Sequence, residues 1–177
     1  MNYFLGTEVE KYEKGFFICQ QKYTIDILKR FKMNKCKPTD TPIAIGTKLS
    51  KQDEGTSMHY TLYKRLVRSL MYLTTTRLDI MYAVSLISRF MEYPKIYHWK
   101  VGKRILRYIT GTIDYGICYS TSEDDPLVGY IDSDFADSVD DRRSTYGYAF
   151  MLCTCLISWA SKKQPIITIS STKGSMW

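Results

Sequence analysis

The run from Val128 to Phe150 constrains the fold most, because it reads as two β-strands joined by an acidic turn. Its first half alternates in character, so that Asp132 and Asp134 leave one face of a strand, about 7 Å apart along it. Two carboxylates in that arrangement can begin a metal site. The second half brings three aromatic residues to one face of the next strand: Tyr146, Tyr148 and Phe150. The run therefore predicts an antiparallel hairpin that carries carboxylates.

Ahead of this hairpin, the sequence predicts another hairpin and then a group of helices. Residues 3–19 alternate apolar and polar side chains around a turn near Gly15. Apolar residues at helical spacing follow over residues 23–31, and again in three stretches after a loop rich in proline and glycine: 63–71, 80–91 and 97–109. We expect Asp79 to cap the helix of residues 80–91. The predicted fold class is α+β, with an N-terminal β-hairpin, a helical middle and a C-terminal antiparallel β-sheet.

The predicted helix of residues 97–109 is a candidate binding surface. Four cations fall within roughly a third of its circumference, opposite an apolar face: Lys100, Lys103, Arg104 and Arg107. Cations at this spacing can meet successive phosphates of a nucleic acid. The alternative is an ordinary solvated face above a buried one.

The net charge of +7 is divided unevenly along the chain. Residues 1–120 carry 20 Lys and Arg against 10 Asp and Glu, whereas residues 121–177 carry 5 against 8. A cationic part beside a carboxylate-rich part suits a phosphate polymer that is held in one place and meets metal ions in another. A basic protein with a solvated surface is the other interpretation.

Several classes of protein are disfavoured by composition. The sequence has no run of eighteen apolar residues and no signal-peptide pattern at its start, so we expect no membrane insertion and no secretion. Its five cysteines form no C-x-x-C pair, and their odd number indicates reduced thiols. The expected location is intracellular, either cytoplasmic or nuclear. With two histidines in the whole chain, a zinc site is also disfavoured.

Several short motifs follow in order through the last third of the chain. They are Gly-Tyr-Ile-Asp-Ser-Asp-Phe-Ala from Gly129, Asp-Asp-Arg-Arg-Ser-Thr-Tyr-Gly-Tyr from Asp140, Ile-Ser-Trp-Ala-Ser-Lys-Lys-Gln from Ile157, and Ser-Ser-Thr from Ser170. In this order they resemble the opening of the ribonuclease H domain in Ty1/copia-type retrotransposon Pol polyproteins. Near the N-terminus, Phe4-Leu5-Gly6 resembles the primer-grip hairpin that holds the end of the primer in reverse transcriptases.

The resemblance divides the chain into three parts. Residues 1–58 are similar to the primer grip and the start of the thumb of a reverse transcriptase. Residues 59–120 are similar to the segment that joins the polymerase to ribonuclease H, and residues 121–177 to an incomplete ribonuclease H-like domain. The implied partner is an RNA–DNA hybrid or another nucleic acid, contacted by Phe4, Leu5 and Gly6 and by the four cations of residues 97–109.

The resemblance also implies a metal site that this chain does not complete. The intact family binds Mg²⁺, and Asp132 corresponds to its first metal ligand. Where the family continues Ser-Ser-Thr-Glu, with the glutamate as the second ligand, this chain has Lys173. One carboxylate and the neighbouring Asp134 are too few ligands for two Mg²⁺ ions. We therefore expect no retained cofactor and no activity of the chain alone.

Three hypotheses follow. The first is a Pol polyprotein fragment that combines a C-terminal region of reverse transcriptase with part of ribonuclease H and is inert in isolation. The second is a non-catalytic nucleic-acid-binding module that uses the basic helix. The third is a degenerate product without function. The sequence carries no signal for an oligomeric state.

Overall fold

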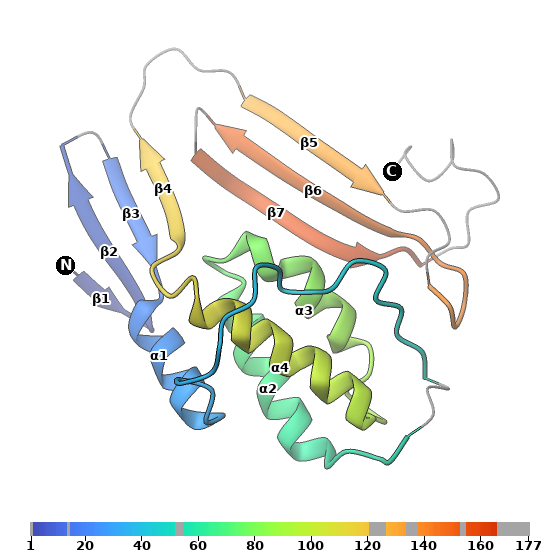
Figure 1. The fold of residues 1–177 in the computed structure, drawn as a ribbon. Helices are drawn as coiled ribbons and strands as arrows, with labels where there is room; N and C mark the ends of the chain where they lie inside the picture. Colours follow the sequence, from blue (N-terminus) through green and yellow to red (C-terminus); the bar gives the residue numbers. More distant parts are fainter. Residues whose placement is uncertain are drawn as a thin grey trace.

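Two antiparallel sheets and a group of helices make up the protein in a computed structural model (Figure 1), which describes residues 2–13, 15–51, 55–120, 127–133, 138–152 and 155–165. The first sheet has the strand order β1 (Asn2–Phe4), β2 (Thr7–Tyr12), β3 (Gly15–Cys19), β4 (Gly116–Ser120). The second has the order β5 (Leu127–Ser133), β6 (Thr145–Leu152), β7 (Cys155–Lys163). The helices are α1 (Gln21–Arg30), α2 (Tyr60–Leu73), the short 3₁₀ helix η1 (Leu78–Ile80), α3 (Met81–Ser88) and α4 (Ile96–Thr110). The α+β class, the N-terminal hairpin, the helical middle and the C-terminal antiparallel sheet are confirmed.

The N-terminal sheet differs from the predicted hairpin in two ways. The stretch predicted as one strand from Tyr3 turns back at Leu5 and Gly6, whose φ angles of 47° and 78° suit a two-residue hairpin turn. A two-residue turn preserves the alternation of the pattern, which therefore did not reveal it. The second difference is β4, which pairs antiparallel with β3 and brings the chain back to its beginning after about a hundred residues.

One hydrophobic core joins α1 to the other helices. Its fully buried members include Ile27 of α1, Leu66 of α2, Ile87 of α3 and Ile105 of α4. The spacing of apolar residues in each helix places these side chains on one stripe, and the four stripes face each other. Residues of 1–58 and of 59–120 therefore share a core. Among the described residues, no helix has the length and apolar character needed to cross a membrane.

Asp79 does not cap α3, so that prediction is wrong. Its two carboxylate oxygens accept hydrogen bonds from Nε and Nη2 of Arg77, at 2.9 and 2.7 Å. Arg77 is almost completely buried and also donates to the carbonyl and hydroxyl oxygens of Thr112, at 2.7 and 2.6 Å. The acid is held by the buried guanidinium, which ties the end of α2 to the end of α4.

The segment from residue 32 to residue 51 wraps around α4 (Figure 1). Arg107 Nε donates to Lys37 O at 2.9 Å, and Arg104 Nη2 donates to Thr41 Oγ1 at 3.0 Å. Farther along, Ser50 Oγ donates to Asp140 Oδ1 at 2.6 Å. We call residues 32–51 the wrapped segment. Its hydrogen bonds link α4 to the turn between β5 and β6.

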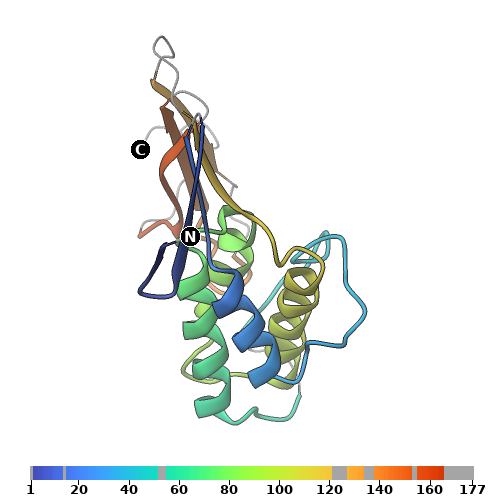
Figure 2. The ribbon, with the colours of Figure 1, turned by 90° about the vertical axis from the view of Figure 1, so that its left-hand side faces the viewer.

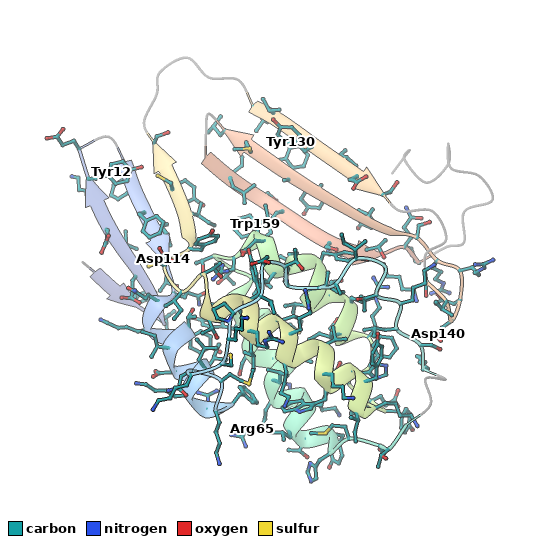
Figure 3. All side chains as sticks on the ribbon, viewed as in Figure 1. Tyr12, Arg65, Asp114, Tyr130, Asp140 and Trp159 are labelled. Carbon is teal, nitrogen blue, oxygen red and sulfur yellow. The ribbon has the colours of Figure 1, made fainter. Side chains whose placement is uncertain are left out.

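The C-terminal sheet is fastened to the helices by polar contacts. Trp159 Nε1 donates to Thr74 O at 3.1 Å, and Figure 3 shows this indole between β7 and the helices. At the base of the sheet Lys163 lies 2.7 Å from Asp141. Burial by itself would raise the pKa of Asp141, but hydrogen bonds led by those from Lys163 and Ser138 lower it to about 2. The Asp141 carboxylate therefore stays ionised at pH values above about 2.

Candidate functional site

Asp132, the predicted metal ligand, lies on β5 and is exposed. It is paired in register with Gly147 of β6. By the alternation of strands, Asp132 shares a sheet face with Tyr130 and with Trp159, which contacts α2. The carboxylate is therefore on the face of the sheet that looks toward the helices. Asp134, its predicted companion, lies outside the described residues, as does Lys173.

A hollow of about 700 Å³ lies between this sheet face and the helices. Its sheet side includes the small residues Gly147 and Ala149, and its helix side includes Leu78, Met81 and Tyr82. Of the described residues that line the hollow, Asp132 is the one carboxylate. Among the residues that the structure describes, no group of three or more Asp, Glu, His or Cys is placed to hold a metal ion. The described donor set does not fit a two-ion site.

The Phe4-Leu5-Gly6 motif forms the tip of the β1–β2 hairpin. Phe4 and Leu5 are 73% and 74% exposed, so two apolar side chains stand in solvent at this tip. The hydroxyl of Tyr72 on α2 donates to Leu5 O, and Gly6 lies so close that an added Cβ would be 3.0 Å from the Tyr72 hydroxyl oxygen. Glycine is needed here for both its positive φ and its lack of a side chain. The tip is thus seated on α2.

Helix α2, on which the tip is seated at Tyr72, carries three cations and no carboxylate, a feature that the sequence analysis missed. They are Lys64, Arg65 and Arg68; the two arginines are exposed, and Lys64 is half-buried, 5.2 Å above the Tyr60 ring. We call the side chains of Lys64, Arg65, Arg68, Met71 and Tyr72 the α2 stripe. Figure 3 places Arg65 at the lower edge of the helical group. The cations are readable in the sequence, but their position beside the hairpin tip is not.

A tyrosine pair braces the α2 stripe from α1. The rings of Tyr23 and Tyr72 meet edge to face, with centroids 4.8 Å apart. Burial raises the pKa of Tyr23, whose hydroxyl donates to Ser69 O. Arg30 Nη1 lies 3.4 Å from Ser69 Oγ and adds another cation at the border of the stripe. The contact with Tyr23 holds the Tyr72 ring, and the Tyr72 hydroxyl in turn holds the hairpin tip at Leu5.

The four predicted cations of α4 divide into two pairs. Lys100 and Lys103 are exposed, whereas Arg104 and Arg107 are half-buried and hold the wrapped segment through the hydrogen bonds given above. The structure therefore places all four on one side of α4, as the spacing predicted. Arg104 and Arg107 also have a structural role, because they hold the wrapped segment. Carbonyl acceptors such as Lys37 O leave no signal in a sequence.

The hairpin tip and the α4 cations lie on different sides of the helical group. Figure 2 shows the β1–β2 turn on the side of α2, and the wrapped segment beyond α4 on the opposite side, with α1 between. The predicted contact residues are therefore not brought together into one site. In the part of the chain that the structure describes, the α2 stripe with the tip and α4 with the wrapped segment form separate cationic surfaces.

Comparisons with known proteins identify relatives of the chain that carries these surfaces. The chain is 40% identical over 173 residues to the retrovirus-related Pol polyprotein from transposon RE2 of Arabidopsis thaliana, covering 98% of this chain and 12% of the relative. It is 40% identical over 179 residues to that from transposon TNT 1-94 of Nicotiana tabacum, covering 96% and 13%. It is also 35% identical to the uncharacterized mitochondrial protein AtMg00810 of Arabidopsis thaliana, covering 98% and 72%.

The matches cover almost the whole chain but only a small part of each Pol polyprotein. No family model and no solved structure matches it. The chain spans about an eighth of the length of the Pol polyproteins, yet nearly all of it is matched, through the helices and both sheets. The chain belongs to the family of retrovirus-related Pol polyproteins from copia-type transposons, of which it is a fragment.

Proposed function

We propose that this chain binds the nucleic acid on which a copia-type Pol polyprotein works, and that it does not cleave nucleic acid by itself. Residues 1–58 supply the primer-grip hairpin and thumb-like start, residues 59–120 the connection, and residues 121–177 an incomplete ribonuclease H-like domain. The observation that carries the proposal is the exposed apolar tip seated beside the α2 stripe, on a helix with three cations and no carboxylate.

The chemistry of this surface suits an RNA–DNA hybrid. Arg65 and Arg68 are less than one helical turn apart, about 4.5 Å along the axis, so both can reach phosphates of one strand. Phe4 and Leu5 offer apolar contact to a sugar or a base at the end of that strand. Phosphate contacts position a nucleic acid without reading its sequence. The proposed binding is therefore electrostatic, independent of sequence and sensitive to salt.

The proposed lack of cleavage follows from the number of carboxylates. Two-ion hydrolysis needs several oxygen ligands around both ions, and Asp132 is the single carboxylate of the described hollow. We expect an end-labelled RNA–DNA hybrid to remain intact when incubated with the purified chain in Mg²⁺ or Mn²⁺, as read on a denaturing gel. Cleavage that disappears in the Asp132→Asn variant would contradict the proposal.

We expect the Arg65→Gln/Arg68→Gln variant to bind an RNA–DNA hybrid on the order of tenfold more weakly at 0.1 M salt. Two lost phosphate contacts reduce the slope of log K against log salt by about 1.8 for a duplex. The measurement is fluorescence anisotropy of a labelled 12-base-pair hybrid, titrated with the chain at several salt concentrations.

The matched control for this experiment is Lys11→Gln/Lys51→Gln. It removes the same charge from exposed lysines on β2 and at the end of the wrapped segment, away from the α2 stripe. The control is expected to shift affinity slightly through net charge while the salt slope changes little. Equal slopes of log K against log salt for the wild-type chain and the arginine variant would contradict the proposed binding of the hybrid by the α2 stripe.

A further inference from the structure

The second cationic surface is a groove. Between α4 and the wrapped segment lies a depression of about 490 Å³. The α4 side presents Tyr97 and the four predicted cations, the opposite wall is formed by Ala44 and Thr47, and Met33 and Val101 complete the lining. No carboxylate is among these lining residues. The predicted basic face is therefore enclosed on one side.

The far wall of the groove is a defined turn. Thr47 donates to Ala44 O through both its backbone N–H, at 3.1 Å, and its hydroxyl, at 2.7 Å. Gly46 has a φ of +73°, which the turn requires. Arg104 and Arg107 hold the earlier part of the wrapped segment against α4. The groove thus has two structured walls.

The lining combines the features that hold a single strand of nucleic acid. Tyr97 is 42% exposed and lies one turn before Lys100 on the same side of α4. Sequence-independent single-strand sites pair a positively charged groove, which follows the backbone, with aromatic rings on which bases stack. The half-buried side chain of Met33 suits the face of a base, and the exposed lysines suit its phosphates.

The size of the groove separates a single strand from a duplex. Its volume is in the range of pockets for small molecules, roughly 300–1,000 Å³. An element one nucleotide wide can enter such a space, whereas a volume of about 490 Å³ is too small to enclose a double helix. Arg65 and Arg68 of the α2 stripe are exposed, and Figure 3 places Arg65 at the lower edge of the helical group, so a duplex suits this surface better.

We propose that the groove between α4 and the wrapped segment is a second nucleic-acid site, selective for single strands, with Tyr97 as stacking platform and Lys100 and Lys103 as phosphate contacts. It rests on the proposed nucleic-acid function but uses a different surface. A chain with both sites holds a hybrid on the α2 stripe and an unpaired stretch of nucleic acid on the opposite side.

The test titrates labelled oligodeoxythymidine, and separately the hybrid, with wild-type chain and with Lys100→Gln/Lys103→Gln. Only the lysines are changed, because removing Arg104 or Arg107 would also release the wrapped segment. We expect the lysine variant to bind the single strand several-fold more weakly, with a salt slope reduced by about 1.4, and to keep its affinity for the hybrid. Tyr97→Leu should weaken single-strand binding severalfold while leaving the slope unchanged.

The outcomes separate this inference from the function on which it rests. Both sites are supported if Lys100→Gln/Lys103→Gln weakens binding of the single strand but not of the hybrid, and if the salt slope for the hybrid falls in the Arg65→Gln/Arg68→Gln variant. An unchanged single-strand slope in Lys100→Gln/Lys103→Gln overturns the groove, whatever the hybrid does. Equal losses for both ligands also overturn it, because selectivity for single strands would then be absent. A hybrid slope that is indifferent to Arg65 and Arg68 counts against the α2 stripe alone.

Discussion

The Arg77→Met variant is expected to lose about 1.5–3 kcal/mol of unfolding free energy, the usual effect of removing hydrogen bonds made by a buried charged group. The guanidinium is 1% exposed and makes four hydrogen bonds, two to Asp79 and two to Thr112. It also lies over the Tyr115 ring, 5.2 Å from the centroid. Methionine fills a similar volume but leaves these acceptors without donors.

Urea denaturation followed by circular dichroism measures this effect. In a chain of this length the loss corresponds to a fall in Tm of about 2–4 °C for each kcal/mol. Arg77→Met/Asp79→Asn is the informative companion: 29% of the Asp79 side chain is exposed, so the carboxylate keeps its solvation without Arg77 and its removal should change stability little beyond the single variant. A single variant within 1 kcal/mol of wild type would show that the Arg77 network contributes little.

The same network has a consequence for Tyr108. Burial, together with a hydrogen bond and the charge of Asp79, raises the pKa of Tyr108 to about 12. The tyrosine therefore remains neutral at any pH at which the protein is handled.

The local sequence pattern shows Arg77 and Asp79 only as a break between two helices, because nothing in it indicates that the arginine is buried. Their partner Thr112 is 35 residues away.

Elements with a long apolar period were predictable. Helix α4 was expected at residues 97–109 and extends from Ile96 to Thr110, because its apolar residues recur at helical spacing and point to one core. The strand β5 was likewise expected around Asp132. The burial pattern of α4 is local, so the sequence contains what is needed; β5 is exposed almost throughout, and its alternation and β-forming residues predicted it instead.

Contacts between distant segments were not predictable. The pairing of β3 with β4 joins Ile18 to Ile117, and neither strand has a feature that names its partner. The same holds for the α2 stripe, whose cations are plain in the sequence while their neighbour, the hairpin tip, is some sixty residues earlier in the chain. Charge was readable from the sequence, but the surface it belongs to was not.

The packing of α2 against α4 gives the second large effect. Gly102 of α4 faces Leu66 of α2, and a Cβ added at Gly102 would lie 2.8 Å from Leu66 Cδ2. Leu66 is fully buried, so its Cδ2 atom must shift within the core to make room. We expect Leu66→Ala to lose about 2–5 kcal/mol through its cavity. Gly102→Ala should lose about 1–3 kcal/mol through overpacking, offset by up to about 1 kcal/mol of helix propensity.

The double variant Leu66→Ala/Gly102→Ala tests whether this one contact carries the effect. The new methyl group enters the space that the leucine leaves, so the double variant should be more stable than the sum of the two single losses by about 0.5–3 kcal/mol. Leu70→Ala/Gly102→Ala is the matched control, since Leu70 is buried on the same helix but is not among the three nearest neighbours of the added Cβ. Losses that add within about 0.5 kcal/mol in both pairs would mean that α2 and α4 are not in close contact at Gly102.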